Sequence, residues 1–384
     1  MRRSAALAVA AIALGTDLFV YGLAIPVLPL IASRHGASSA AVGFLFATYA
    51  IALLVATPVV GMLVDRIGPR TPMLVGLLGL AAATLLFASV HSFPGLVAAR
   101  ALQGGAAAVS WVAGLSLVAA VYPAAERGKP MGIVLSATGV GILLGPLAGG
   151  VLAQHFGTAV PFYVAAGVAA LDGLARLLLI RDVPHVRRET PARVWRHPLA
   201  PLAIGLTAAG AGLIAFLEPI VPLETAQRYG ATSQQIGLVF SGAALVGALA
   251  APLSGTLADR VPRAVLAGGG ALLGAVGLLV VSTAGSLWAI ALGVAITATG
   301  GQFVLVPTLA LIGELAESAR PPVYGAAYAL YSVAYTAGLV VAPLSAGFGR
   351  GVAGFRTTTL VAAVVAVAIG AYAATRRTPA PHTV

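Results

Sequence analysis

The sequence predicts an all-α membrane protein with twelve transmembrane helices arranged as two pseudo-symmetric six-helix bundles. Three observations favour this fold class: an apolar composition, the regular return of apolar runs, and a repeat between the two halves. Of the 384 residues 59% are hydrophobic and only 9% are charged, and the mean hydropathy is +1.00. Soluble proteins carry roughly 25% charged residues, so this composition indicates a chain that lies in lipid.

The apolar runs are each long enough to cross a bilayer, which takes about 20 helical residues. The first run extends too far to be a cleaved signal segment, and we interpret it as an uncleaved helix. The predicted spans are 5–30, 40–64, 71–90, 95–122, 130–153, 159–180, 200–223, 234–257, 263–283, 286–313, 324–348 and 355–375.

The longest polar break, at 181–199, carries five arginines and divides the spans into two groups of six. We therefore predict an N-terminal bundle at 1–180, a cytoplasmic central loop at 181–199, a C-terminal bundle at 200–375 and a cytoplasmic tail at 376–384. The halves repeat, because ATPVVGMLVDR at 56–66 corresponds to AAPLSGTLADR at 250–260. Two similar halves with a cleft between them are typical of secondary transporters.

The distribution of basic residues predicts the orientation of the chain. Of the 22 lysines and arginines, sixteen fall in loops on one side, and only Arg34, Arg228, Arg350 and Arg356 fall on the other. By the positive-inside rule both termini are cytoplasmic, and we expect a multi-pass protein of the cell's inner (plasma) membrane. The net charge of +11 then reflects orientation and contact with lipid headgroups, and we expect no nucleic-acid partner.

The residues that metal and enzyme sites use are sparse. The chain has no cysteine, and its six histidines are scattered. No nucleophile, base or metal cluster is recognisable, so we predict no metal, no cofactor and no enzymatic activity.

Charged residues inside predicted spans are the main functional signal, because each costs at least about 2.5 kcal/mol unless it is paired or hydrated. Asp17 lies near the middle of the first span, Glu218 lies in the seventh, and Arg100 lies in the fourth with Gln103 nearby. We expect Asp17 and Glu218 to exchange a proton for a cation as access to solvent alternates. The alternative is that either carboxylate forms a structural ion pair with Arg100.

Asp172 and Arg176 are also charged and lie four residues apart in the sixth span. Residues at this spacing are neighbours on a helix face. We expect this pair to neutralise itself and to extend its polar ends toward the membrane surface, in a structural role.

Aromatic residues mark the expected substrate cavity. In the eleventh span Tyr324, Tyr328, Tyr331 and Tyr335 share one helix face. Such a stripe is more often packing than a ligand site, but aromatic rings can also bind a flat or cationic ligand. The predicted cavity residues are Tyr21, Tyr49, Trp111, Phe216, Gln302, Phe303, Tyr328, Tyr331, Ser332 and Tyr335.

Small residues in the fifth span predict a close helix contact. Gly141, Gly145 and Gly149 follow one another at intervals of four, which places them on one stripe where another helix can approach backbone to backbone. Together with three neighbouring positions they form a pattern that resembles the antiporter motif of major facilitator superfamily exporters; the matching residues are Gly132, Gly141, Gly145, Pro146, Gly149 and Gly150.

Other stretches extend the resemblance to this superfamily. GMLVDRIGPR at 61–70 resembles its loop between helices two and three, and RALQGG at 100–105 resembles its fourth-helix motif, which is associated with proton coupling. The resemblance implies a gating loop in each half, formed by Gly61, Asp65, Arg66, Gly68 and Arg70 and, in the weaker second copy, by Asp259 and Arg260. A loop that only fixes topology is the alternative.

Several segments are more specifically similar to the vesicular amine transporter family and its bacterial drug-exporting relatives. Among them are LDG at 171–173, LEP at 217–219 and VYG at 323–325. The resemblance implies proton-driven antiport of an organic cation, with Asp17 and Glu218 in the acidic roles. Two further acids of that family correspond here to Gln302 and Ser332, and a lysine corresponds to Tyr49, so a broader drug exporter is the safer interpretation.

The predicted function is export of small cationic or amphipathic, drug-like molecules in exchange for protons, by a monomer. One alternative is a transporter of neutral solutes such as sugars or a natural product, with Gln103, Gln302 and the tyrosines as hydrogen-bonding groups. Another is a membrane sensor or scaffold, which the shortness of every loop disfavours.

Overall fold

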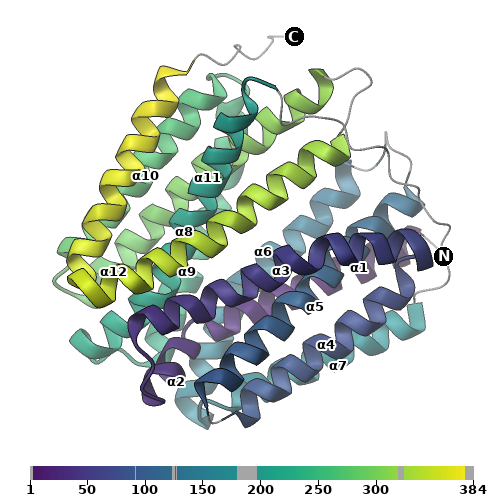
Figure 1. The fold of residues 1–384 in the computed structure, drawn as a ribbon, viewed down its shortest axis with the longest axis horizontal. Coiled ribbons are helices and arrows are strands. Elements are labelled where there is room, and N and C mark those ends of the chain that lie inside the picture. The colour runs from purple at the N-terminus through teal and green to yellow at the C-terminus, as the bar shows by residue number, and fades with distance from the viewer. Residues whose placement is uncertain are drawn as a thin grey trace. The chain divides into compact units, whose positions relative to one another are not determined.

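The computed structural model describes residues 3–90, 92–122, 126, 128–179, 197–318 and 324–376. In these ranges the chain forms helices and no strand (Figure 1). The helices are α1 (Arg3–Ala24), α2 (Leu28–Arg34), α3 (Ser39–Ile67), α4 (Arg70–Ser89), α5 (Phe93–Val121), α6 (Gly128–Phe156), α7 (Val160–Leu179), α8 (Ala200–Tyr229), α9 (Ser233–Ala258), α10 (Arg263–Thr283), α11 (Leu287–Ser318) and α12 (Tyr324–Thr375).

Eleven of the described helices are long and apolar enough to cross a membrane, and α2 is the exception. Their outer faces keep large apolar side chains exposed, among them Val55, Leu78, Leu171 and Leu249. Such faces would be unfavourable in water and are suited to lipid. Helices are also what a bilayer requires, since no water is available there to satisfy backbone groups.

The first predicted span is wrong at its end. The sequence predicts one helix over 5–30, but α1 ends at Ala24 and a turn leads into the seven-residue α2. Pro26 lies in that turn, and Pro29 lies in the first turn of α2, where a proline is tolerated because its missing N–H would have no helical partner.

Helix α12 contains the last two predicted spans, 324–348 and 355–375. It is 52 residues long, and its backbone leaves the helical conformation at Gly354, where φ is +77° and ψ is 168°. A positive φ is accessible to glycine without a Cβ clash. The break between the two spans is thus a kink at one residue and not a loop.

The chain separates into two compact units. Unit 1 comprises Met1–Ala37, Thr48–Arg188 and Thr232–Ser241, and unit 2 comprises Ser38–Ala47, Glu189–Ala231 and Gly242–Val384. The first turns of α3 therefore belong to unit 2, and the first turns of α9 belong to unit 1. The predicted central loop and tail lie almost entirely outside the described residues.

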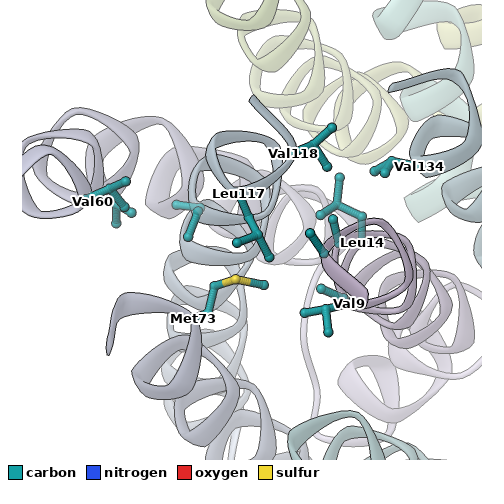
Figure 2. Packing of buried hydrophobic residues seen from close by; sticks show 13 residues of the cluster. Val9, Leu14, Val60, Met73, Leu117, Val118 and Val134 are labelled. Carbon is teal, nitrogen blue, oxygen red and sulfur yellow. The ribbon is translucent and has the colours of Figure 1, made fainter. Parts of the chain in front are cut away.

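The core of unit 1 is built from α1, α3, α4, α5 and α6. Figure 2 shows Val9 and Leu14 of α1 near Leu117 and Val118 of α5, with Met73 of α4 beside them. Small alanines fill the remaining contacts, so the helices approach closely. Unit 2 has a smaller apolar cluster around Leu311, Ile312 and Leu315 of α11.

The glycine stripe of α6 packs against α1, in agreement with the predicted close contact. A Cβ added to Gly141, Gly145 or Gly149 would overlap backbone atoms of Gly15, Phe19 or Leu23, all in α1. Gly150 meets the start of α9 in the same way, and Pro146 contacts Gly22 and Gly237. Gly132 does not share this packing, because no atom lies within 4 Å of its added Cβ; it lies more than two helical turns before the stripe begins.

Candidate functional site

Asp17 lies at the centre of a buried polar cluster in unit 1. It sits on α1 with none of its surface exposed. Its Oδ2 accepts hydrogen bonds from Tyr49 Oη at 3.3 Å and from Trp111 Nε1 at 3.2 Å. Three helices, α1, α3 and α5, therefore converge on this carboxylate.

The second carboxylate oxygen of Asp17, Oδ1, is buried and has no hydrogen-bond partner among the described residues. Among the described residues, Asp17 also forms no ion pair with Arg100. These residues therefore do not show the structural ion pair that the sequence left open as an alternative for Asp17. A buried acceptor without a partner costs about 1–3 kcal/mol. Oδ1 is thus the atom of this cluster that a proton or a cationic group would satisfy.

Arg100 occupies the neighbouring part of the same cluster. Its Nη1 donates a hydrogen bond to Gln103 Oε1 at 2.7 Å, and both side chains are fully buried. Its guanidinium lies 4.9 Å from the centroid of the Tyr21 ring and 5.4 Å from that of Tyr49. These two rings, expected to face a ligand, thus already stabilise a resident cation by cation–π contact.

Asp172 and Arg176 of α7 form an ion pair, as their spacing predicts, but they do not extend toward the membrane surface. Both side chains are buried, and Arg176 Nε donates to Asp172 Oδ1 at 3.0 Å while Nη2 donates to Oδ2. Arg176 Nη1 donates to the Met73 carbonyl of α4 at 3.1 Å. The contact between α7 and α4 captures the guanidinium inside unit 1, which is why the expected snorkelling is wrong.

The charges of unit 1 act on one another. Arg176 and Arg100 are the two cations whose charges act on Asp17. The guanidiniums of α5 and α7 thus both act on the carboxylate of α1.

Unit 2 holds a third buried carboxylate among the described residues. Glu218 is 4% exposed on α8, and Tyr335 of α12 lies within its electrostatic reach. Tyr335 stacks on Tyr331 with ring centroids 6.3 Å apart. Helix α8 runs unbroken through Pro219 and Pro222. Each unit thus places one acid beside tyrosine rings.

The remaining cavity residues predicted in unit 2 differ in how deeply they are buried. Phe216 is buried, and Gln302 and Phe303 are half-buried. Tyr328 is 45% exposed, and Ser332 is exposed with its Oγ donating to the Tyr328 carbonyl. The tyrosine face of α12 is thus split between half-buried Tyr331 and Tyr335 and exposed Tyr328; the side chain of Tyr324 lies outside the described residues.

The predicted gating loop forms the sharp connection between α3 and α4. Gly68 has a φ of +77°, and its N–H donates to the Val64 carbonyl. Asp65, Arg66 and Arg70 are exposed around it, and Gly61 is buried in the last turns of α3. In the second copy Asp259 and Arg260 are exposed, and Arg263 forms an ion pair with Glu314 of α11.

One polar cluster was not predicted from the sequence. In unit 2, Arg350 of α12 donates to Ser39 Oγ at 2.7 Å, to Gln227 Oε1 at 2.7 Å and to Glu224 Oε2 at 3.3 Å. The only signal for it was the placement of Arg350 and Ser39 on the same predicted side of the membrane.

Comparison with known proteins decides the family. Residues 8–217 and 202–384 match the family model described as Major Facilitator Superfamily. The chain belongs to the major facilitator superfamily. The all-helical fold class predicted from the sequence is thereby confirmed, and the family consists of transporters.

Relatives of this major facilitator chain include named amine transporters. The rat synaptic vesicular amine transporter is 30% identical over 335 residues, covering 85% of this chain and 64% of the relative. The human chromaffin granule amine transporter is 31% identical over 316 residues, covering 80% and 59%. A zebrafish protein named probable vesicular acetylcholine transporter-B is 32% identical over 375 residues, covering 89% and 73%. The chain spans about three fifths of the length of the mammalian relatives.

Solved structures share the fold. A bacterial homologue of the human lysosomal transporter Spinster, in an inward-facing and unoccupied conformation, gives a TM-score of 0.82 at 16% identity and covers 98% of this chain and 99% of that one. The human organic anion transporter MFSD10 gives 0.69 at 20% identity, covering 97% and 100%.

Proposed function

We propose that this major facilitator chain exports small organic cations, or amphipathic drug-like molecules that carry a cation, in exchange for protons by alternating access. The observation that carries the proposal is Asp17 itself: a carboxylate with no exposed surface, held by Tyr49 and Trp111, whose Oδ1 has no partner among the described residues. A buried carboxylate in this state is stabilised by a proton or by an ammonium group.

Two further observations support a cationic cargo. The indole of Trp111 donates its Nε1–H to Asp17, so an aromatic ring lies beside the carboxylate. Aromatic rings and an anion together are suited to organic ammonium ions. The relatives are named as transporters of amines or of acetylcholine, and these molecules carry a positive nitrogen.

In the proposed cycle the cation and the proton compete for the same carboxylates. On one side of the membrane a proton binds Asp17 or Glu218, neutralises it and releases the cargo; on the other side the proton leaves and a new cation enters. Neither species needs a covalent step. The gating loops and the glycine stripe of α6 would serve the change of access, in a monomer of the plasma membrane with both termini in the cytoplasm.

The experiment is proton release driven by substrate in proteoliposomes. Addition of a lipophilic cation should move protons through the wild-type protein, and Asp17→Asn and Glu218→Gln should each abolish that movement. Glu126→Gln is the matched control, because Glu126 is an exposed carboxylate paired with Arg3. Unchanged coupling in both acid variants would exclude this mechanism.

A neutral cargo is the second candidate, and one observation favours it. Gln103 Nε2 is buried and has no hydrogen-bond partner among the described residues. Such a donor suits the hydroxyl or carbonyl of a neutral solute. Competition binding with sugars against lipophilic cations separates the two candidates, since displacement by sugars alone would favour the neutral cargo.

A further inference from the structure

The proposed function leaves one buried ion pair of unit 1 without a role. Asp172 and Arg176 lie one turn apart on α7, and both are buried. Arg176 is fixed by three hydrogen bonds, two to the carboxylate of Asp172 and one to the Met73 carbonyl of α4. Stability alone does not require such a pair, because apolar side chains of similar volume are often as stable in its place.

The fold of unit 1 brings this guanidinium close to Asp17. Helix α7 packs against both α1 and α4. Leu14, about one helical turn before Asp17 on α1, lies in the same apolar cluster as Met73 of α4 (Figure 2). The carbonyl of Met73 is the group that Arg176 binds. The charge of Arg176 is therefore held at a fixed place within unit 1, on the side of α1 that carries Leu14.

The groups that face Asp17 come from the helices that pack around it. Tyr49 of α3 and Trp111 of α5 donate hydrogen bonds to its Oδ2. Arg100 of α5 and Arg176 of α7 are the cations whose charges act on it. The residues of α6 that meet α1 are glycines, which carry no charge. Of the two cations, only Arg176 belongs to an ion pair whose other member can be changed without touching the cluster around Asp17.

Burial favours the protonated form of a carboxyl group, and a nearby positive charge favours the ionised form. We propose that Arg176 sets the pH at which Asp17 takes up and releases its proton, and that Asp172 adjusts this pH by neutralising part of the guanidinium charge. Arg176 is thus a positioning residue that acts through Asp17. This inference rests on the proposed function and adds to it the group that keeps Asp17 able to release its proton and accept a cation.

The direct readout is the fluorescence of Trp111, because its indole N–H donates to Asp17 and its surroundings change when this acid is protonated. The chain has three tryptophans, so Trp195→Phe with Trp288→Phe leaves Trp111 alone. In a pH titration in detergent, the part of the signal that Asp17→Asn removes reports the proton on Asp17. If Asp17→Asn removed no part of it, Asp17 would exchange no proton, and this inference and the proposed function would both fail.

Two variants of the pair should move the midpoint of this titration in opposite directions. Asp172→Asn leaves the guanidinium uncompensated, so Asp17 ionises more readily and the midpoint should fall by about 0.5–1 pH unit. Asp172→Asn with Arg176→Gln removes the guanidinium that acts on Asp17, so the midpoint should rise, by up to about one pH unit. If the pair served packing alone, neither midpoint would move, or both would move in the same direction, and either result would overturn the proposal.

Two further variants separate charge from geometry. Arg176→Lys keeps the charge and loses the planar fork, so its midpoint should stay closer to that of the wild type than the midpoint of the double variant does. Equal midpoints in Arg176→Lys and the double variant would count against the proposal, and this comparison holds even if Asp172→Asn does not fold. Glu126→Gln is the matched control, because it removes a carboxylate from an exposed pair with Arg3. A shift there as large as in Asp172→Asn would also contradict the proposal.

The pH profile of transport distinguishes this inference from the proposed function. Ethidium, a monovalent lipophilic cation, is loaded into proteoliposomes, and the pH of half-maximal proton-coupled export should move with the Trp111 midpoint in each variant. Proton-coupled export with the same pH profile in all variants would overturn the role of Arg176 and leave the antiport intact. Trp111 midpoints that shift as expected, while ethidium moves no protons, would overturn the proposed function and support the control of Asp17 by Arg176.

Discussion

Arg350 and Ser39 are joined by a hydrogen bond of 2.7 Å between residues 311 positions apart in the chain. The bond fastens the first residue of α3 to α12. Close to it, a Cβ on Gly43 of α3 would overlap the Pro343 carbonyl of α12, and Gly347 meets Ser39 and Gly43 equally closely. The first turns of α3 are thus held to helices of unit 2 by one polar bond and one close backbone contact.

We expect that covalent fixation of this contact stops transport, because alternating access requires helices at one membrane face to separate in each cycle. The chain has no cysteine, so Ser39→Cys with Arg350→Cys gives an unambiguous pair for a short, reducible bifunctional thiol reagent. Ethidium export from proteoliposomes should cease on linking and return on reduction. The two single variants treated with the same reagent are the controls, and full activity in the linked protein would show that these residues need not part.

The glycine stripe predicts a second, position-specific result. Gly145→Ala should destabilise the protein by about 1–3 kcal/mol, because a methyl group there meets the α1 backbone, which cannot move aside without shifting the helix. Gly132→Ala on the same helix meets nothing within 4 Å and should be neutral or stabilising by up to about 1 kcal/mol. Thermal unfolding in detergent compares the two, and equal effects would mean that helix propensity and not packing governs α6.

These helices were predictable from the sequence because lipid leaves the backbone few alternatives. An apolar run of about 20 residues must be a helix there, so hydropathy alone places nearly every span. The end of α1 was not predictable in the same way. Prolines occur inside α3, α6, α8, α9, α11 and α12 without breaking the helix, and nothing local distinguishes Pro26, which follows the end of α1.

The acids of the candidate site were predictable for a related reason, since a charge in an apolar run is conspicuous. The residues that contact these acids were harder to predict. That Tyr49 and Trp111 both donate to Asp17, and that Arg100 lies over Tyr21, depends on how three helices rotate about their axes, which sequence spacing does not specify. The spacing of Asp172 and Arg176 predicted their pairing correctly, but the Met73 carbonyl that keeps Arg176 inside is a backbone group and leaves no trace in the sequence.

The Asp172–Arg176 pair predicts a marked asymmetry between single and double substitution. Asp172→Asn should cost about 3–5 kcal/mol of stability, because it leaves the buried Arg176 guanidinium without its counter-ion. Asp172→Asn with Arg176→Gln should recover most of that loss, since neither remaining amide is charged. Chemical denaturation in detergent measures both.

The exposed pair between Arg3 and Glu126 provides the control for that series. Its side chains are 54% and 56% exposed, and an exposed ion pair contributes at most about 1 kcal/mol. Arg3→Gln should therefore have little effect. If the double variant were no more stable than Asp172→Asn alone, the unpaired charge of Arg176 would not be the cause of the loss. The packing of the two side chains, and not their charge balance, would then stabilise this site.

Trp111 gives the most direct probe of how Asp17 is held. Trp111→Phe keeps an aromatic ring but removes the Nε1–H that donates to Asp17 Oδ2 at 3.2 Å. A hydrogen bond to a charged group contributes about 1.5–3 kcal/mol, so the variant should lose that much stability while the carboxylate is ionised. In the background of Asp17→Asn the same substitution should cost less than half as much, because the acceptor is no longer charged. Trp288→Phe is the control, as Trp288 is 63% exposed. Equal losses from Trp111→Phe in both backgrounds would show that the indole acts by packing alone, and would remove Trp111 from the group of residues that position Asp17.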